Sequence, residues 1–371
     1  MTQSRLTSLL ARMAQANLDA IALVPGPNLF YFTGLSFHLS ERPVVGLFSS
    51  RGGPAIVLPE LEAGKPALAP FAIQAFTYSE DEASWRRAFQ QAAQSLGLAG
   101  AKVGVEGRRM RVMDLRFLEA AAPGASFEPA EPVLASLRMI KSSEEAANMR
   151  KAAVIAEAAL QATLPRIRPG MSEKTLAAEL TAQILAAGSD SEVPFTPIVA
   201  SGPNSALPHA FPTERQLQLG ELLVLDWGAA VNGYFSDITR TFVLGNVDDE
   251  MKRIYELVKQ ANAAGRAAVS PGVTCQQVDR AARQVILDGG YGQYFIHRTG
   301  HGLGLEGHEE PNIREGDALS LAEGMTFTIE PGIYLPGRGG VRIEDNMIVT
   351  ALGGESLTTF PRDLHVLHPD S

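Results

Sequence analysis

The apolar residues in the first 135 positions follow two patterns, continuous runs and helical spacings. The continuous runs predict strands at residues 20–24, 44–49, 55–58 and 102–105. Apolar positions three or four residues apart predict helices at residues 5–17, 82–96 and 110–121. Strands that alternate with helices are typical of an α/β domain, and we expect this domain to span residues 1–135.

The pattern changes after residue 135, where long helices begin with recognisable caps. Ser142 and Glu145 form a capping box for a helix predicted to reach about residue 164. Further helices are predicted at residues 172–188, 248–268 and 274–289. We expect these helices to belong to a second domain, residues 136–371.

This second domain has the pattern of an internal duplication. The segment Pro169-Gly170-Met171-Ser172 recurs as Pro271-Gly272-Val273-Thr274, at an offset of 102 residues, and each copy joins a long helix to a shorter one. Each copy continues into a predicted strand, at 195–200 and at 294–298, and then into a hairpin. Chance similarity is the alternative, but four aligned features favour a pseudo-two-fold α+β domain with a curved, mainly antiparallel sheet.

The two hairpins place acids at equivalent positions. In each, an apolar strand ends in an acid six residues after a glycine, at Asp226 and at Glu330, and the returning strands carry Asp237 and Glu344. In the first hairpin Asn232-Gly233 is a strong two-residue turn signal. With this turn Asp226 lies opposite Thr239 and Asp237 opposite Gly228, so the two aspartates are diagonal neighbours on one face.

Carboxylates this close in apolar surroundings repel each other unless a cation lies between them. Solvated acids at strand ends are the alternative, which two duplicated pairs disfavour. Four histidines, His209, His297, His301 and His308, cluster where a neutral imidazole ligand is needed, and the last three lie in a glycine-rich run that allows close approach of the backbone. Four carboxylates and one imidazole balance two divalent ions, and the oxygen-rich set favours Mn²⁺, with Co²⁺ or Zn²⁺ as alternatives. Two such ions are suited to ionising a water and polarising a carbonyl.

Composition and charge narrow the class of protein. The chain has 371 residues, 45% apolar and 20% charged, with a net charge of −9. The negative charge argues against a nucleic-acid partner. No apolar run has the length of a signal peptide or a membrane span, and one cysteine excludes a disulfide framework. We therefore expect a cytoplasmic protein without membrane contact.

The acids and their neighbours resemble the pita-bread metallopeptidases, the family of methionine aminopeptidase, prolidase and aminopeptidase P. The resemblance is carried by Leu225-Asp226-Trp227-Gly228, Ser236-Asp237-Ile238-Thr239-Arg240-Thr241, Gly300-His301-Gly302-Leu303-Gly304, Ile329-Glu330-Pro331-Gly332 and Arg342-Ile343-Glu344-Asp345. Asn28-Leu29-Phe30-Tyr31-Phe32-Thr33-Gly34 resembles the creatinase-type N-terminal domain of the proline-specific branch. That extra domain makes a methionine aminopeptidase a poor match.

The resemblance implies a role for each residue. Asp226 and Asp237 hold one metal, His301 binds the other, and Glu330 and Glu344 contribute to both. Glu330 also shuttles a proton, and Phe195 and Ile198 line a proline pocket. His209, His297, His308 and Arg342 orient the substrate, and His308 or His297 stabilises the oxyanion. The loop 34–43, with His38, is expected to reach the active site of a neighbouring subunit in a homodimer.

The resemblance leaves the preferred substrate open between two activities. Some prolidases carry an arginine after the segment His308-Glu309-Glu310-Pro311, and here this position is Asn312. Because a cation near the bound peptide is missing, we expect aminopeptidase P, which cleaves peptides with proline second and prefers Xaa-Pro-Yaa tripeptides to Xaa-Pro dipeptides. Xaa-Pro dipeptidase (prolidase) is the alternative, and an inactive peptide-binding protein is a remote one. Arg298 and Arg338 are candidate substitutes for the missing cation.

Overall fold

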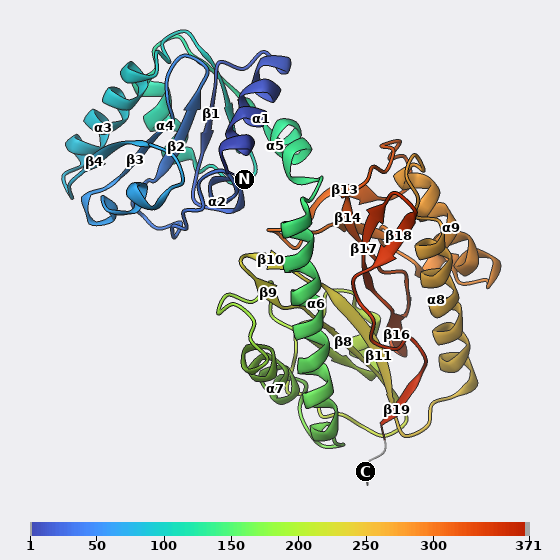
Figure 1. Cartoon of the computed structure of the whole chain (residues 1–371). Coiled ribbons are helices and arrows are strands. Elements are labelled where there is room, and N and C mark those ends of the chain that lie inside the picture. The colour runs from blue at the N-terminus through green and yellow to red at the C-terminus, as the bar shows by residue number, and fades with distance from the viewer. Residues whose placement is uncertain (1, 368–371) are drawn as a thin grey trace. The chain divides into compact units, whose positions relative to one another are not determined.

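The computed structural model describes residues 2–367, which form two compact units. The first unit ends at Arg138 and the second begins at Met139 (Figure 1). The boundary expected after residue 135 falls inside a helix, α5 (Glu131–Arg138), and the units divide where this helix ends. No helix among the described residues has the length and apolar character needed to cross a bilayer.

The first unit is built on a six-stranded sheet. Its strands, in spatial order, are β4 (Gln74–Tyr78), β3 (Ala55–Pro59), β2 (Val45–Ser49), β1 (Ala20–Leu23), β5 (Lys102–Val105) and β6 (Ser126–Pro129). Only β2 runs antiparallel to both of its neighbours. The central strands read as continuous apolar runs because both faces of the sheet are covered. This confirms the predicted α/β class.

Helices pack against the sheet of the first unit. The remaining helices of this unit are α1 (Thr2–Gln15), α2 (Pro27–Thr33), α3 (Glu82–Ser95) and α4 (Val112–Ala121), with 3₁₀ turns η1 (Glu60–Glu62) and η2 (Lys65–Leu68). Phe89 of α3 and Phe117 of α4 stack at 5.1 Å and belong to the core formed with the sheet. The edge strands β4 and β6 were not predicted, because most of their residues are partly or fully exposed and interrupt the apolar runs.

The second unit contains the two predicted pairs of helices. They are α6 (Ser143–Thr163), α7 (Glu173–Ala186), α8 (Asp249–Ala267) and α9 (Cys275–Asp288), with 3₁₀ turns η3 (Leu164–Arg166), η4 (Gly202–Ala206) and η5 (Gly292–Tyr294). The predicted caps are present: the Ser142 hydroxyl accepts from the Glu145 N–H at 3.3 Å, and the Ser142 N–H donates to the Glu145 carboxylate at 2.7 Å. Thr274 and Gln277 form the equivalent capping box.

Two main sheets lie between these helices (Figure 1). One has the order β19 (His365–Leu367), β11 (Ile238–Leu244), β8 (Glu221–Trp227) and β7 (Ile198–Ser201). The other has the order β13 (Glu309–Ile313), β12 (Gly300–Gly302), β14 (Thr326–Ile329), β17 (Asp345–Thr350) and β18 (Gly353–Ser356). Two short hairpins, β9 (Ala230–Val231) with β10 (Tyr234–Phe235) and β15 (Gly332–Leu335) with β16 (Gly339–Arg342), complete the unit.

The duplication is visible in matching hydrogen bonds. The N–H of Gly170 donates to the carbonyl of Leu217 at 2.9 Å, and the N–H of Gly272 donates to the carbonyl of Leu321 at 2.8 Å. Both glycines have a left-handed backbone, with φ of 85° and 84°. The same turn therefore ties the start of the second helix of each half to the strand connection that follows it.

One predicted strand in this unit is wrong. Residues 294–298 form no strand, and η5 ends at Tyr294. The guanidinium of Arg283 donates to the carbonyls of Phe295 and His297 at 3.1 and 2.8 Å. A side chain therefore satisfies carbonyls that a neighbouring strand would otherwise bond, and the chain follows α9 instead of joining the sheet.

The register predicted for the first hairpin is confirmed, with a local interruption. Asp226 pairs with Thr239 and Val231 with Tyr234, and Asn232 and Gly233 have φ of 52° and 78°. The ladder is not regular at Gly228 and Asp237, which were expected to pair. Here the N–H of Asp237 donates to the side-chain carbonyl of Asn346 at 3.0 Å, so Asp237 is held by the other half of the unit.

Candidate metal centre and active site

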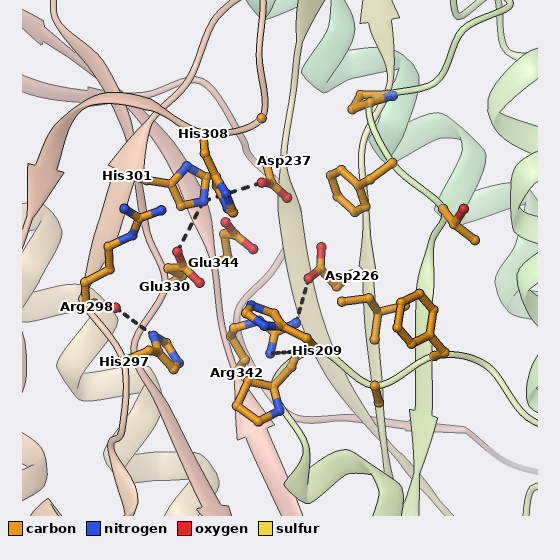
Figure 2. Close-up of a pocket in the computed structure, with 18 of the residues that line it drawn as sticks. His209, Asp226, Asp237, His297, Arg298, His301, His308, Glu330, Arg342 and Glu344 are labelled. Carbon is orange, nitrogen blue, oxygen red and sulfur yellow. Dashed lines mark hydrogen bonds and ion pairs between the residues drawn. The ribbon is translucent and has the colours of Figure 1, made fainter. Parts of the chain in front are cut away.

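A pocket of about 670 Å³ in the second unit is lined by residues from both halves of the duplication (Figure 2). All five predicted metal ligands line it: Asp226, Asp237, His301, Glu330 and Glu344. The acids come from the ends of strands, where β8, β11, β14 and β17 present side chains to one another. The pocket therefore lies where the predicted hairpins meet.

Three of these residues form a compact cluster. Asp237, His301 and Glu344 each offer a ligand atom within 4.8 Å of the other two. The Nε2 atom of His301 lies 3.3 Å from Oε1 of Glu330 and 3.7 Å from Oδ2 of Asp237. Asp226 is on the other side of the pocket and faces the same space (Figure 2). The arrangement is a cage of four carboxylates and one imidazole.

Burial makes the charged form of this cage costly. It raises the pKa of Glu330 to about 7, and it holds the pKa values of Asp237 and Glu344 well above their ordinary range. Repulsion among the neighbouring carboxylates acts in the same direction. Two buried oxygens, Oδ1 of Asp226 and Oδ1 of Asp237, have no hydrogen-bond partner among the described residues. Cations bound between the acids would satisfy these oxygens and relieve the repulsion, so the donor set fits divalent ions.

His301 is prepared to act as a neutral ligand. Its Nδ1 lies 3.0 Å from the carbonyl of Gly302, which places the ring proton on Nδ1 and leaves the Nε2 lone pair facing the acids. Burial, with the nearby His308, lowers the pKa of His301 well below its usual value. The imidazole therefore stays neutral over the range in which metal binds.

Arg342 holds one of the metal ligands in place. Its Nη2 donates to Oδ2 of Asp226 at 2.6 Å, and its Nε donates to the hydroxyl of Thr239 at 3.1 Å. The same hydroxyl donates to Oε2 of Glu344 at 2.5 Å. Arg342 was predicted to orient the substrate. The structure shows that it contacts Asp226, one of the predicted metal ligands, and its contact with substrate stays a prediction.

Tyr334 is a residue that sequence reasoning missed. Its hydroxyl accepts from Nη1 of Arg342 at 3.1 Å and lies 2.9 Å from Nε2 of His297. The Nδ1 of His297 lies 2.6 Å from the carbonyl of Arg298, so both ring nitrogens of His297 have hydrogen-bond partners within the protein. The hairpin register could have found Tyr334, because the pairing of Gly332 with Arg342 places it two positions along the same ladder.

His308 and His209 lie on either side of the acids (Figure 2). The ring of His308 packs edge-on against that of His301, with centroids 4.2 Å apart, and burial together with Arg298 lowers its pKa. His209 lines the pocket beside Arg342. Both ring nitrogens of His297 have partners in the protein, and the oxyanion role of His308 or His297 stays a prediction.

An apolar wall faces the acids. It contains the predicted Phe195 and Ile198, and also Pro194, Pro208, Phe211 and Pro212, which sequence reasoning missed. Phe211 is 82% exposed, so this wall extends to the pocket mouth. His38 is exposed in the first unit and does not line this pocket. The expectation that its loop reaches a neighbouring subunit stays a prediction.

The two arginines considered as substitutes for the missing cation have different positions. Arg298 lines the pocket, next to Glu330 and His301 in Figure 2. Arg338 is half exposed and pairs with Asp248 at 2.8 Å and with Glu250. Asn312 does not line the pocket; its side-chain carbonyl accepts from Nη1 of Arg298. Of these two arginines, only Arg298 lines the pocket.

The raised pKa values predict how the metal-free protein responds to pH. The pKa of Glu330 rises from about 4.5 in the unfolded chain to about 7 in the fold, so the folded state binds more protons between these values. Stability should therefore fall as the pH rises from about 6.5 to 8, and Asp237 and Glu344 act in the same direction. Below about pH 6.5 the lowered pKa values of His297, His301 and His308 act in the opposite direction. We expect the melting temperature in EDTA to drop by about 5 °C or more, and divalent metal to restore it. A melting temperature that rises with pH above about 6.5 in EDTA would contradict this assignment.

Comparison with known proteins agrees with the class that this cage defines, a dinuclear metallopeptidase. Residues 147–351 match metallopeptidase family M24, and residues 5–140 match the creatinase/prolidase N-terminal domain. The chain belongs to metallopeptidase family M24, and its two units are a creatinase-type N-terminal domain and a pita-bread catalytic domain. The predicted fold class is therefore confirmed.

Individual relatives cover nearly the whole chain. The "Probable dipeptidase PepE" of Mycobacterium tuberculosis is 38% identical over 98% of this chain and 96% of its own length. The Xaa-Pro dipeptidase of Pyrococcus furiosus is 35% identical over 98% and 99%. A prolidase structure from Thermococcus sibiricus matches with a TM-score of 0.93 at 35% identity, covering 99% of both chains. An X-Pro aminopeptidase structure from Thermotoga maritima matches with a TM-score of 0.85 at 29% identity, covering 97% and 99%. The chain is therefore a metal-dependent peptidase of the Xaa-Pro-cleaving group.

Proposed function

We propose that the protein is an Xaa-Pro dipeptidase, the alternative to the aminopeptidase P reading favoured by the sequence motifs. The observation that carries this proposal is the position of Arg298 in the pocket. Several of the most similar relatives are named dipeptidases, which supports the same choice. The expectation of aminopeptidase P rested on a missing cation at position 312, and Arg298 supplies a cation from another strand connection.

The bonding of Arg298 suits it to a carboxylate ligand. In an Xaa-Pro dipeptide the free carboxylate follows the scissile bond directly, and burying it requires a fixed cation. Asn312 accepts a hydrogen bond from Arg298, and its amide donates to Glu310 at 2.5 Å. This neutral side chain orients the guanidinium without cancelling its charge. The described residues give Arg298 a hydrogen bond to Asn312 and no ion pair, and Glu330 and Glu310 act on its charge only through longer-range attraction, so the guanidinium can still bind a substrate carboxylate.

The other pocket residues divide the remaining tasks. Two bound divalent ions would supply an ionised water and polarise the scissile carbonyl. Glu330 would take up the proton from that water at a carboxylate oxygen and pass it to the proline nitrogen as the bond breaks. His308 donates a hydrogen bond to the developing oxyanion. Phe195 and Ile198 pack against the proline ring and exclude water from it.

A comparison of substrate lengths tests this function. We expect kcat/KM for an Xaa-Pro dipeptide to exceed that for the matching Xaa-Pro-Yaa tripeptide by about tenfold or more, because only the dipeptide places its carboxylate beside Arg298. Steady-state hydrolysis of Met-Pro and Met-Pro-Ala with added Mn²⁺ measures the ratio. A reversed ratio would identify an aminopeptidase P, which the similarity to the Thermotoga maritima enzyme keeps as the second candidate. No hydrolysis of either peptide would leave the inactive peptide-binding protein.

Several finer properties belong to the same proposal. The oxygen-rich cage supports Mn²⁺ as the native metal, with Co²⁺ and Zn²⁺ as alternatives, and reconstitution of the metal-free protein with each ion separates them. A homodimer and a cytoplasmic location remain predictions from the sequence. Sedimentation of the purified chain at micromolar concentration tests the first of these.

A further inference from the structure

A buried ion pair includes Glu309, the residue that follows His308 in the sequence. The Nζ atom of Lys141 lies 3.1 Å from Oε2 of Glu309, and the two side chains are only 1% and 6% exposed. The pair joins two distant parts of the second unit: Lys141 precedes α6, and Glu309 begins β13. Neither residue lines the pocket, so the metal cage and the peptide do not explain the pair.

Glu309 connects this pair to the loop that carries His308. Its second oxygen, Oε1, accepts hydrogen bonds from the N–H groups of Leu305 and Glu306 at 2.9 and 3.1 Å. Lys141 is itself fixed, because its N–H donates to the carbonyl of Gly324 at 2.8 Å, next to β14. The carboxylate of Glu309 therefore links the loop 303–308 to a rigid position on the sheet.

A glycine makes room for this contact. A Cβ atom at Gly304 would lie 2.8 Å from Oε2 of Glu309 and 2.9 Å from Cε of Lys141. The glycine-rich run was expected to allow close approach to the metal site. At Gly304 the close approach is instead to the ion pair, so this part of the motif serves the loop and not the cage.

The loop 303–308 is anchored near its start by the buried side chains of Leu303 and Leu305, and Glu309 restrains the part that leads to His308. Between His301 and His308 the chain contains Gly302, Gly304 and Gly307, and the pairing of β12 with β13 shifts register after His301. His308 is exposed to the pocket, and its ring contacts that of His301 at 4.2 Å. A loop this rich in glycine loses much conformational entropy when it is held in one conformation. Polar contacts from Glu309 add to the packing of the two leucines and hold the amide of Glu306, two residues before His308.

We propose that Lys141 and Glu309 are positioning residues for His308, and that they hold its imidazole where it can donate a hydrogen bond to the oxyanion. This inference rests on the proposed function, because it assigns His308 a contact with the reacting carbonyl. Buried ion pairs often add little net stability, since desolvation offsets their attraction. The pair should therefore matter more for turnover than for the stability of the fold.

The variant Lys141→Met tests the proposal, with Glu157→Gln as the matched control. Glu157 is also a buried carboxylate whose Oε1 accepts from two successive backbone N–H groups, but these belong to Thr359 and Phe360, in the C-terminal segment. We expect Lys141→Met to lower kcat by about 10- to 100-fold, as misplacement of a substrate-stabilising group does. Metal stoichiometry should be unchanged, and Glu157→Gln should retain wild-type kcat.

A double-mutant cycle with His308→Ala distinguishes positioning from general damage. If Lys141 acts through His308, the double variant Lys141→Met with His308→Ala should be no slower than His308→Ala alone. Losses that multiply would overturn the proposal, as would a wild-type kcat in Lys141→Met. If Lys141→Met is poorly folded, the neutral pair Lys141→Met with Glu309→Gln replaces it in the cycle, because it leaves no unpaired buried charge.

Hydrogen exchange gives a readout that does not depend on activity. The amides of Leu305 and Glu306 should exchange at least about tenfold faster in Lys141→Met than in the wild type, and should be unaffected by Glu157→Gln. Unchanged exchange at both amides would overturn the proposal. The cycle is measured on whichever proline peptide the wild-type enzyme cleaves best. Failure of the dipeptide preference therefore rejects the proposed function separately, without deciding the role of the ion pair.

Discussion

Replacing Glu330 by glutamine is expected to lower kcat by about 10³-fold or more and to reduce the metal content of the purified protein. Glu330 lies 3.3 Å from Nε2 of His301, and its side chain is 15% exposed. The amide has the same shape but carries no negative charge for the cations and cannot take up the proton from water. Steady-state kinetics on an Xaa-Pro dipeptide and metal analysis of the same sample measure the two effects. Asp226→Asn should behave alike.

Glu173→Gln is the control for loss of a buried carboxylate. Glu173 is fully buried and accepts hydrogen bonds from Ser201 and Thr213, away from the cage. This variant should lose stability but keep its metal and most of its turnover per folded molecule. Full activity with normal metal stoichiometry in Glu330→Gln would remove Glu330 from the metal site.

Replacing Arg298 by methionine is expected to change substrate preference more than catalytic chemistry. The variant keeps much of the side-chain volume and removes the charge that faces the pocket. A charge-assisted bond to a buried carboxylate contributes about 2–5 kcal/mol, so kcat/KM on the dipeptide should fall by about 10²-fold or more. On the matching tripeptide the fall should be less than about threefold, because its carboxylate lies farther along the chain.

Arg338→Met is the matched control for that experiment. Arg338 is also an arginine of the second unit, but its side chain is 48% exposed and pairs with Asp248. Its loss should leave both substrates within about twofold of wild type, as expected for an exposed ion pair. An equal loss on dipeptide and tripeptide in Arg298→Met would show that Arg298 does not read the substrate carboxylate.

Local signals in the sequence were sufficient for most of the fold. The Asn232-Gly233 turn fixed the register of its hairpin, and cap residues such as Ser142 marked the starts of long helices. Both features act between residues near in sequence, so they can be read directly. The edge strands and the segment 294–298 were misjudged because exposure and a long-range bond from Arg283 determine their conformation.

The ligands of the cage were predictable because their chemistry lies in residue type and order. The contacts of the residues around the cage could not be predicted in this way. Asn312 looked like a missing cation, but its role depends on Arg298, which reaches it across the pairing of β12 with β13. Tyr334 and the occupied ring of His297 likewise depend on which side chains meet in space. Side-chain contacts between distant segments carry the information that the sequence pattern lacks.

The duplicated architecture gives the metal a mechanical role beside its chemical one. Asp226 and Asp237 come from the first half of the catalytic unit, and His301, Glu330 and Glu344 from the second. An ion held by Asp237 and Glu344 would therefore link the two halves of the catalytic unit and close a long loop of chain, as a reversible crosslink does. Metal binding would then also join the two halves of the catalytic unit.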